Sequence, residues 1–342
     1  MNRRTLLLAA PALLLTPRPA PAQPASAPVP PTSSPFTPVL DSAAALAPLR
    51  TVHVAHNNQL VAARAYNGVG LDAPANIKSA SKSVMSALVG IAIDKGVLES
   101  PDQPIAPLLA RDLPDDPDPR LAKVTIGNLL SMQAGLARTS GPNYGRWIAS
   151  RNWVRAALAE PFEEDPGGSM LYSTGSTHLI SAILTRKAGR PTLALAREWL
   201  GPVEGFAITS WDRDPQGIYF GGNQMAMRPS SLLAFGEIYR RGGTTADGAR
   251  IVSQAWIDES WRVRTQSRFT GDGYGYGWFR RRLGGADVAY AWGYGGQMLY
   301  IAPARGLTLA MTSATDAPAG RSGHRDDLHR LAAALIEAAG TG

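Results

Sequence analysis

The chain has 342 residues, of which 44% are hydrophobic and 18% charged, as is typical of a globular protein long enough for one large domain. Its formal net charge of +7 falls by three, to +4, without Arg3, Arg4 and Arg18 of the N-terminal segment. This modest charge, with no basic run, does not favour nucleic-acid binding. Cysteine is absent, which excludes disulfides, a thiolate nucleophile and cysteine-bound zinc.

Residues 1–22 have the features of an export signal. The paired Arg3-Arg4 is followed by an apolar core over residues 6–15 and by a small-x-small site ending at Ala22. The arginine pair resembles a twin-arginine signal, so we expect export to the periplasm. Pro11 interrupts the core, which is far shorter than the ~20 residues that span a bilayer. No stable membrane insertion of the mature protein is therefore expected.

The next segment, residues 23–38, is predicted to be a linker. Nine of the 27 prolines lie between residues 17 and 38, where few side chains could join a hydrophobic core. Such a composition favours an extended, polyproline-like backbone. The folded domain is therefore expected over residues 39–342.

The folded part begins and ends with strand patterns. Residues 50–66 form two β-type runs around Asn57-Asn58, which predicts a hairpin. Residues 80–95 have the pattern of a helix that is buried on most sides. Helical patterns dominate from about 100 to 260. Beyond them, short aromatic or β-branched runs separated by glycines predict strands, and the segment HRDDLHRLAAALIEAA predicts a final helix.

This order of elements predicts an α+β fold. The N-terminal hairpin and the C-terminal strands have to pair in one antiparallel sheet, flanked by helices, if the chain forms one unit. We expect an α/β part over about 39–80 and 270–342, with an inserted all-α subdomain over about 81–269. The helix that follows Ser79 is expected to lie between the two parts.

The stretch Ser79-Ala80-Ser81-Lys82 carries the first candidate chemistry. A serine and a lysine three positions apart on a helix lie on the same face. Burial beside an apolar helix would favour the neutral, basic lysine, which could activate the serine hydroxyl. On these four residues alone, a helix-capping serine and a lysine that reaches water remain the simpler interpretation.

Further motifs follow in an order that resembles the serine β-lactamase and penicillin-recognising superfamily. The nucleophile region is NIKSASKSVMSALVG, and TIGNLLSMQAGL resembles the helix after it. PGGSMLYSTGSTHLISAIL resembles the tyrosine motif, and NQMAMRPSSLLAFGEIYRRGG a lid-side helix. GYGYGW and AWGYGGQMLYIAP resemble the C-terminal strands. The likeness spans about residues 45–340. It is closest to class C β-lactamase-like esterases and amide hydrolases, including the 6-aminohexanoate-dimer hydrolase group.

This resemblance implies catalytic roles for three side chains. Ser79 would form an acyl-enzyme, Lys82 would help to deprotonate it, and Tyr172 would complete the base pair and protonate the leaving group. The backbone N–H of Ser79 would form an oxyanion hole with that of Tyr294 or Gly295. The resemblance implies neither a metal nor an organic cofactor.

Two departures from the family pattern bear on the substrate. Tyr-x-Asn ends here in Thr174, and the Lys-Thr-Gly motif is Ala291-Trp292-Gly293, without a cation. The resemblance makes Thr174, Trp292, Gly293 and Gly296 candidate substrate-binding residues. The aromatic side chains near this motif could rim an apolar pocket or simply fill the core: Tyr274, Tyr276, Trp278, Tyr290, Trp292 and Tyr294.

The resemblance favours hydrolysis of a small-molecule ester or linear amide. A β-lactamase, a D-alanyl-D-alanine peptidase and a catalytically silent penicillin-binding protein stay open as alternatives. Other constellations are weak. His53 and His56 would point to opposite sides of a strand, which disfavours a metal site, and no Gly-x-Ser-x-Gly motif is present. The oligomeric state cannot be predicted from these patterns.

Overall fold

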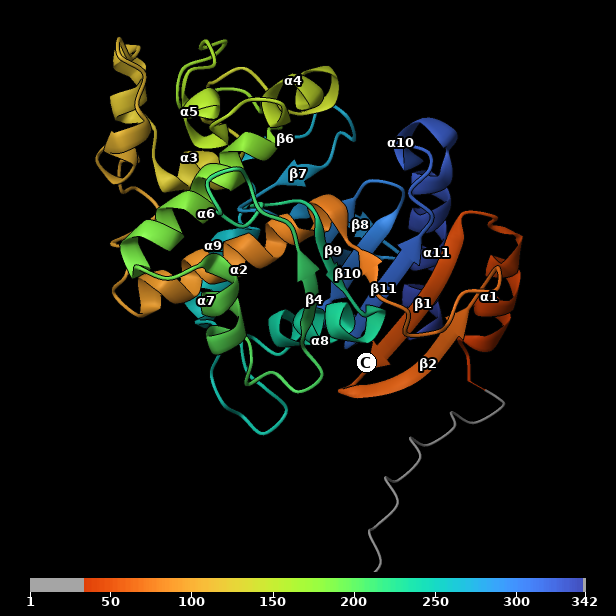
Figure 1. Ribbon diagram of the computed structural model, residues 1–342. Helices are drawn as coiled ribbons and strands as arrows, with labels where there is room; N and C mark the ends of the chain where they lie inside the picture. Colours follow the sequence, from red (N-terminus) through yellow and green to blue (C-terminus); the bar gives the residue numbers. More distant parts are fainter. Residues whose placement is uncertain (1–33, 341–342) are drawn as a thin grey trace, which may run out of the picture. The chain divides into compact units, whose positions relative to one another are not determined.

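The computed structural model describes residues 34–340 (Figure 1). The predicted signal peptide over 1–22 and the predicted linker up to residue 33 lie outside the described residues. The first helix begins at Thr37, within the last two residues of the predicted linker. Among the described residues, no helix combines the length and the apolar character needed to cross a membrane.

The elements follow the predicted order of strands, a mainly helical middle, further strands and a final helix. The α-helices are α1 (Thr37–Ser42), α2 (Ser81–Asp94), α3 (Ile126–Leu130), α4 (Tyr144–Ile148), α5 (Trp153–Leu158), α6 (Thr174–Ala188), α7 (Thr192–Trp199), α8 (Pro229–Arg240), α9 (Gln254–Trp261), α10 (Ala319–Ser322) and α11 (His324–Ala338). Short 3₁₀ helices are η1 (Ala43–Ala45), η2 (Lys78–Ala80), η3 (Pro107–Asp112), η4 (Pro119–Lys123), η5 (Gly141–Asn143) and η6 (Pro303–Arg305).

The strands form two antiparallel sheets. The larger has eight strands in the order β2-β1-β11-β10-β9-β8-β7-β6, and the smaller has three in the order β3-β5-β4. Their bounds are β1 (Leu49–His56), β2 (Gln59–Ala65), β3 (Ala75–Asn76), β4 (Ile208–Trp211), β5 (Met225–Met227), β6 (Thr265–Gln266), β7 (Gly273–Tyr274), β8 (Phe279–Leu283), β9 (Ala286–Gly293), β10 (Gln297–Ala302) and β11 (Leu307–Ser313). The small sheet is not predicted, because strands of two to four residues carry no readable alternation.

The two ends of the domain meet in the larger sheet, as predicted. The hairpin β1–β2 turns at Asn57 and Asn58, both with positive φ (48° and 70°), as a two-residue hairpin turn requires. β1 then pairs with β11, with Val54 opposite Leu309. The N-terminal hairpin and the C-terminal strands therefore share one antiparallel sheet, and the α+β prediction is confirmed.

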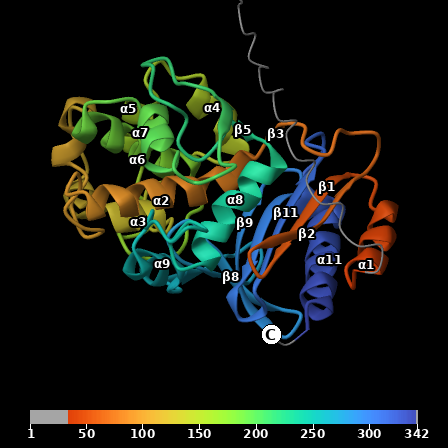
Figure 2. The same ribbon diagram turned by 90° about the horizontal axis from the view of Figure 1, so that it is seen from below.

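Both faces of the sheet are covered by helices. On β10, Leu299 and Ile301 join the core that contains α2 and α8, whereas Met298 and Tyr300 join the core under α11. This alternation follows from the two-residue period of a strand. Figure 2 shows α8 and α11 on opposite sides of the sheet.

The place of α8 corrects the sequence-based assignment. The segment resembles a lid-side helix and falls in the predicted all-α subdomain, but α8 packs on strands β1, β10 and β11 of the sheet. Gly236 allows this close approach, because a Cβ atom there would lie 2.6 Å from Leu299 Cδ1. The helix therefore supports the sheet, and none of its residues lines the pocket described below.

Helix α2 lies at the centre of the domain, as predicted. It contacts α6 and α7 on one side and β9 on the other (Figure 1). Residues 81–92 of this helix are all buried, so it has no polar face. Surrounded in this way, α2 holds the residues at its N-terminus rigidly between the sheet and the helices.

Gly90 offers a test of this packing. An alanine in place of glycine normally stabilises a helix by about 1 kcal/mol. Here the added methyl group would overlap the indole ring of Trp256, which is itself buried. We therefore expect Gly90→Ala to lower the free energy of unfolding by about 1–3 kcal/mol, measured by urea denaturation. An unchanged or raised stability would contradict the packing of α2 against α9.

Candidate active site

Ser79 and Lys82 come together at the start of α2. Ser79 lies in η2, the 3₁₀ turn that runs directly into α2, and Lys82 is in the first turn of α2. Lys82 Nζ donates a hydrogen bond to Ser79 Oγ over 3.1 Å. The side chain of Lys82 is 1% exposed, whereas Ser79 is partly open to a pocket. The simpler interpretation, in which the lysine reaches water, is therefore wrong.

Burial changes the protonation of Lys82. Within residues 34–340 no carboxylate pairs with its amine, and desolvation lowers the pKa of Lys82 to about 7. A substantial fraction of the side chain is therefore a neutral amine at neutral pH. A neutral amine can accept a proton from Ser79, which an ammonium group cannot.

Two further acceptors orient the amine. Gly222 O accepts a hydrogen bond from Lys82 Nζ over 2.7 Å, and Thr174 Oγ1 lies 3.3 Å from it. A carbonyl can only accept, so one N–H of Lys82 has to point at Gly222. In the charged form the third N–H is donated to Ser79 Oγ; in the neutral form, with the other N–H on Thr174, the lone pair faces Ser79 Oγ instead. Thr174, proposed from sequence as a substrate contact, is buried and does not line the pocket.

Tyr172 reaches the same site from the loop before α6. Its ring centroid is 5.2 Å from Lys82 Nζ, and the ring stacks on Phe279 and meets Tyr274 edge-on. Burial raises the pKa of Tyr172 to about 12, and interaction with the Ser79 side chain lowers it by less. The phenol therefore stays protonated at neutral pH and is a proton donor beside Ser79.

The end of strand β9 approaches the nucleophile from the other side. A Cβ atom on Gly293 would overlap the carbonyl oxygen of Ile77, so only glycine lets this strand approach η2 so closely. Tyr294 follows in the turn and lines the same pocket as Ser79, whereas Gly295 does not. Gly296 is buried against α11, with Leu328 and His324 as its neighbours. Which backbone N–H joins that of Ser79 in the oxyanion hole, that of Tyr294 or that of Gly295, stays a prediction.

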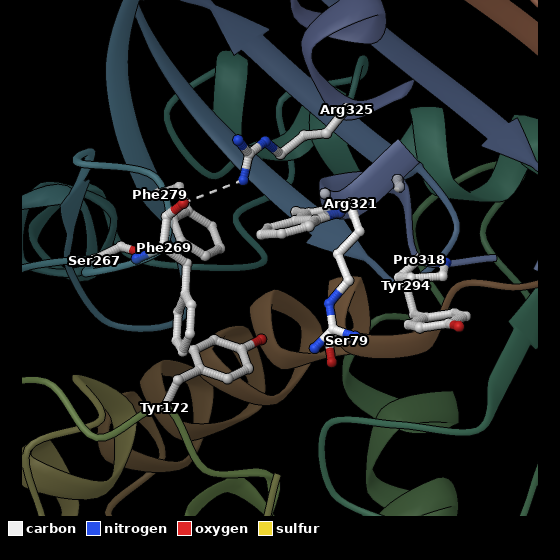
Figure 3. Close-up of a pocket in the computed structure, with 12 residues that line it drawn as sticks. Ser79, Tyr172, Ser267, Phe269, Phe279, Tyr294, Pro318, Arg321 and Arg325 are labelled. Atoms are coloured by element: carbon white, nitrogen blue, oxygen red, sulfur yellow. Dashed lines mark hydrogen bonds between the residues drawn. The ribbon is translucent and has the colours of Figure 1, made fainter. Parts of the chain in front are cut away.

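The pocket at Ser79 has a volume of about 340 Å³ and a largely aromatic wall (Figure 3). Trp292 and Tyr294 line it, as does Phe269, which sequence reasoning missed. The other predicted aromatic residues are buried outside the wall: Tyr274, Tyr276, Trp278 and Tyr290. Core packing is therefore the right interpretation for four of the six aromatic residues. Two of the predicted substrate-binding residues, Gly293 and Gly296, do not line the pocket either.

Two arginines supply the positive charge that the third motif lacks. Arg321 of α10 and Arg325 of α11 line the pocket, and Figure 3 shows the Arg321 side chain extending toward Ser79. Arg325 is held by Asp326 at 3.1 Å and by the carbonyl oxygen of Phe269 at 3.3 Å. Within residues 34–340, the Arg321 side chain has no hydrogen-bond or ion-pair partner. No motif in the sequence marks these arginines, because only the fold brings α10 beside β9.

The protonation of Lys82 can be measured directly. The chain has five lysines, so the side-chain nitrogens of a labelled sample can be followed by NMR, with Lys82→Met to assign the signal. Because burial disfavours the charged form, we expect a midpoint near pH 7 for Lys82. A midpoint near the ordinary value of 10.5 would contradict a buried, unpaired amine.

Comparisons with known proteins agree with the fold. Three of the solved structures that share the fold illustrate this. EstCE1, described as a hydrolase with promiscuous acyltransferase activity, is 16% identical with a TM-score of 0.69, over 89% of this chain and 97% of that one. A D-stereospecific amidohydrolase from Streptomyces sp. is 17% identical with a TM-score of 0.66, over 86% and 97%. A Bacillus anthracis chain assigned as a 6-aminohexanoate-dimer hydrolase is 18% identical with a TM-score of 0.67, over 86% and 81%.

No curated protein matches the sequence. The model of the Beta-lactamase family matches residues 43–334, which include Ser79, Lys82, Tyr172 and the end of β9. The family expected from the sequence motifs is thus confirmed: the chain belongs to the Beta-lactamase family.

Proposed function

We propose that this protein is a serine hydrolase that cleaves an ester or linear amide through an acyl-enzyme on Ser79. One observation carries the proposal. The amine of Lys82 is buried, has a lowered pKa and lies in hydrogen-bond contact with the hydroxyl of Ser79, which is itself open to the pocket. A hydroxyl beside a neutral amine in an accessible cavity is an activated nucleophile.

Acylation begins with proton transfer from Ser79 Oγ to Lys82 Nζ. Ser79 Oγ then attacks the substrate carbonyl carbon, and the backbone N–H groups of Ser79 and of Tyr294 or Gly295 stabilise the negative charge on its oxygen. Tyr172 is protonated at neutral pH, so it gives its proton to the departing alcohol or amine and recovers one from Lys82. The C–O or C–N bond breaks, and the acyl group stays on Ser79.

Deacylation reverses these roles. A water molecule takes the place of the leaving group and passes a proton to the Lys82 and Tyr172 pair as it attacks the acyl carbon. The ester bond to Ser79 breaks, and Ser79 Oγ regains a proton from Lys82. No metal or organic cofactor takes part in this scheme.

The lining of the pocket indicates which chemical groups a substrate would carry. Its apolar wall suits an aliphatic or aromatic acyl group, and Arg321 suits a carboxylate on the same substrate. The lack of a cation in the third motif therefore does not limit the chemistry to neutral esters and amides. Substrates with a carboxylate, β-lactams among them, are therefore still included. The alternative function, a penicillin-binding protein without turnover, also stays open.

The test is a hydrolysis panel with purified protein. It pairs p-nitrophenyl butyrate with an ester that carries a terminal carboxylate, and adds a linear oligoamide and nitrocefin. We expect Ser79→Ala to remove turnover of every substrate that the wild type cleaves. We expect Tyr172→Phe to lower kcat by about 10²–10⁴ for the amide and by less for the ester, because an amine leaves only when protonated.

Thermal unfolding of each variant shows whether the fold is intact. Equal activity of Ser79→Ala and the wild type, or no turnover of any substrate, would contradict the proposal. Slow, stoichiometric labelling by a fluorescent penicillin without release would instead support the silent binding protein.

A further inference from the structure

We propose that a buried histidine–aspartate pair, His178 and Asp214, positions the catalytic lysine through the backbone of Gly221 and Gly222. The inference rests on the proposed function, because it takes Lys82 as the base that activates Ser79. Neither His178 nor Asp214 lines the pocket. They act as positioning residues, behind the groups that touch the substrate.

The path starts at the lysine. The hydrogen bond from Lys82 Nζ to Gly222 O, at 2.7 Å, is the shortest that this amine makes. The direction of that carbonyl sets the direction of the amine, because a carbonyl cannot donate. A rotation of the Gly221–Gly222 backbone would therefore turn the lone pair of Lys82 away from Ser79 Oγ.

Side chains of α6 hold this backbone in place. Gly221 N–H donates to His178 Nδ1 over 3.3 Å, and Gly221 O lies 3.1 Å from Thr177 Oγ1, whose hydroxyl proton it shares with Thr174 O at 3.0 Å. Because Nδ1 accepts, the ring proton of His178 is on Nε2. His178 Nε2–H in turn donates to Asp214 Oδ2 over 2.9 Å. The carboxylate thus selects the tautomer that can hold Gly221.

Asp214 is anchored as firmly as the histidine. Its Oδ1 atom accepts the backbone N–H groups of Gln216 and Ile218, each over 2.8 Å. The side chains of His178 and Asp214 are both 0% exposed. The imidazole ring lies among the aromatic rings of Trp147, Trp153 and Phe220. This packing leaves the imidazole little freedom to rotate.

The two glycines are required by the same geometry. A Cβ atom on Gly221 would overlap the carbonyl oxygen of Thr177, and one on Gly222 would lie 2.8 Å from Lys82 Cγ. Gly222 also has φ of +79°, which other residues rarely adopt. The backbone therefore lies directly against both the lysine and α6, where the pair can act on it.

The pair is not explained by stability alone. An apolar pair of similar volume would often stabilise a core as well as a buried charge with its partner does. What an apolar pair could not supply is an acceptor for Gly221 N–H. Gly221 N–H belongs to the same short backbone segment as Gly222 O, which accepts a hydrogen bond from Lys82 Nζ. The pair therefore affects the orientation of the Lys82 amine.

The sharpest test is Asp214→Asn, which keeps size and shape. Asn Oδ1 still accepts from Gln216 and Ile218, so its amide group faces His178 Nε2 as a donor. The ring proton then moves to Nδ1, where it opposes Gly221 N–H. We expect kcat to fall about 10- to 100-fold with KM nearly unchanged, because the change affects the base and not the pocket.

Tyr300→Phe is the matched control. It removes the buried hydrogen bond between Tyr300 and His329 on the α11 side of the sheet, over 3.0 Å, and should leave kcat unchanged. A kcat for Asp214→Asn within twofold of that of Tyr300→Phe, at similar thermal stability, would overturn the proposal. If Asp214→Asn does not fold, His178→Asn and His178→Gln replace it. Asn keeps an acceptor near Gly221 and should retain more kcat than Gln.

A second readout does not depend on turnover. In labelled protein, the side-chain NMR signal of Lys82 should shift in Asp214→Asn and stay in place in Tyr300→Phe. An unmoved Lys82 signal in Asp214→Asn would overturn the positioning role, even if the wild type were active. A shifted signal in a protein without any hydrolytic activity would keep the positioning role and contradict only the proposed function.

Discussion

The site depends on one constraint: the Lys82 amine is buried, and none of the described residues gives it a carboxylate partner. Three segments supply its hydrogen-bond partners: η2 with Ser79, the start of α6 and the loop at Gly222. Each gives the amine a neutral oxygen partner, so the lysine keeps its hydrogen bonds but gains no counter-charge. A carboxylate in any of these places would raise the pKa of Lys82 and remove its basicity.

The larger sheet helps to position the site from the side opposite the helices. The eight strands and the helices on both faces fix β9, and Gly293 lets the end of β9 approach the backbone just before Ser79. Ser79 therefore lies between Lys82, whose amine is oriented by its hydrogen bonds, and the turn that follows the end of β9. The pocket opens beside them, where α10 and α11 add positive charge to an aromatic wall.

Local sequence patterns predict the parts of this arrangement that depend on nearby residues. The Ser79–Lys82 spacing, the Asn57-Asn58 hairpin and the final helix all follow from turns or periods within a few positions. Arg321, the Gly222 carbonyl and the place of α8 do not, because tertiary packing alone brings them to the site or the sheet. Backbone acceptors in particular leave little trace in a sequence, although paired glycines such as Gly221-Gly222 indicate a close approach.

The central claim is that Ser79 carries the acyl group. The most direct measurement is mass spectrometry of protein quenched with acid during turnover of p-nitrophenyl butyrate, followed by peptide mapping. The account predicts one butyryl group per chain, on the peptide that contains Ser79, and none in Ser79→Ala. A butyryl group on another residue, with turnover retained in Ser79→Ala, would contradict it.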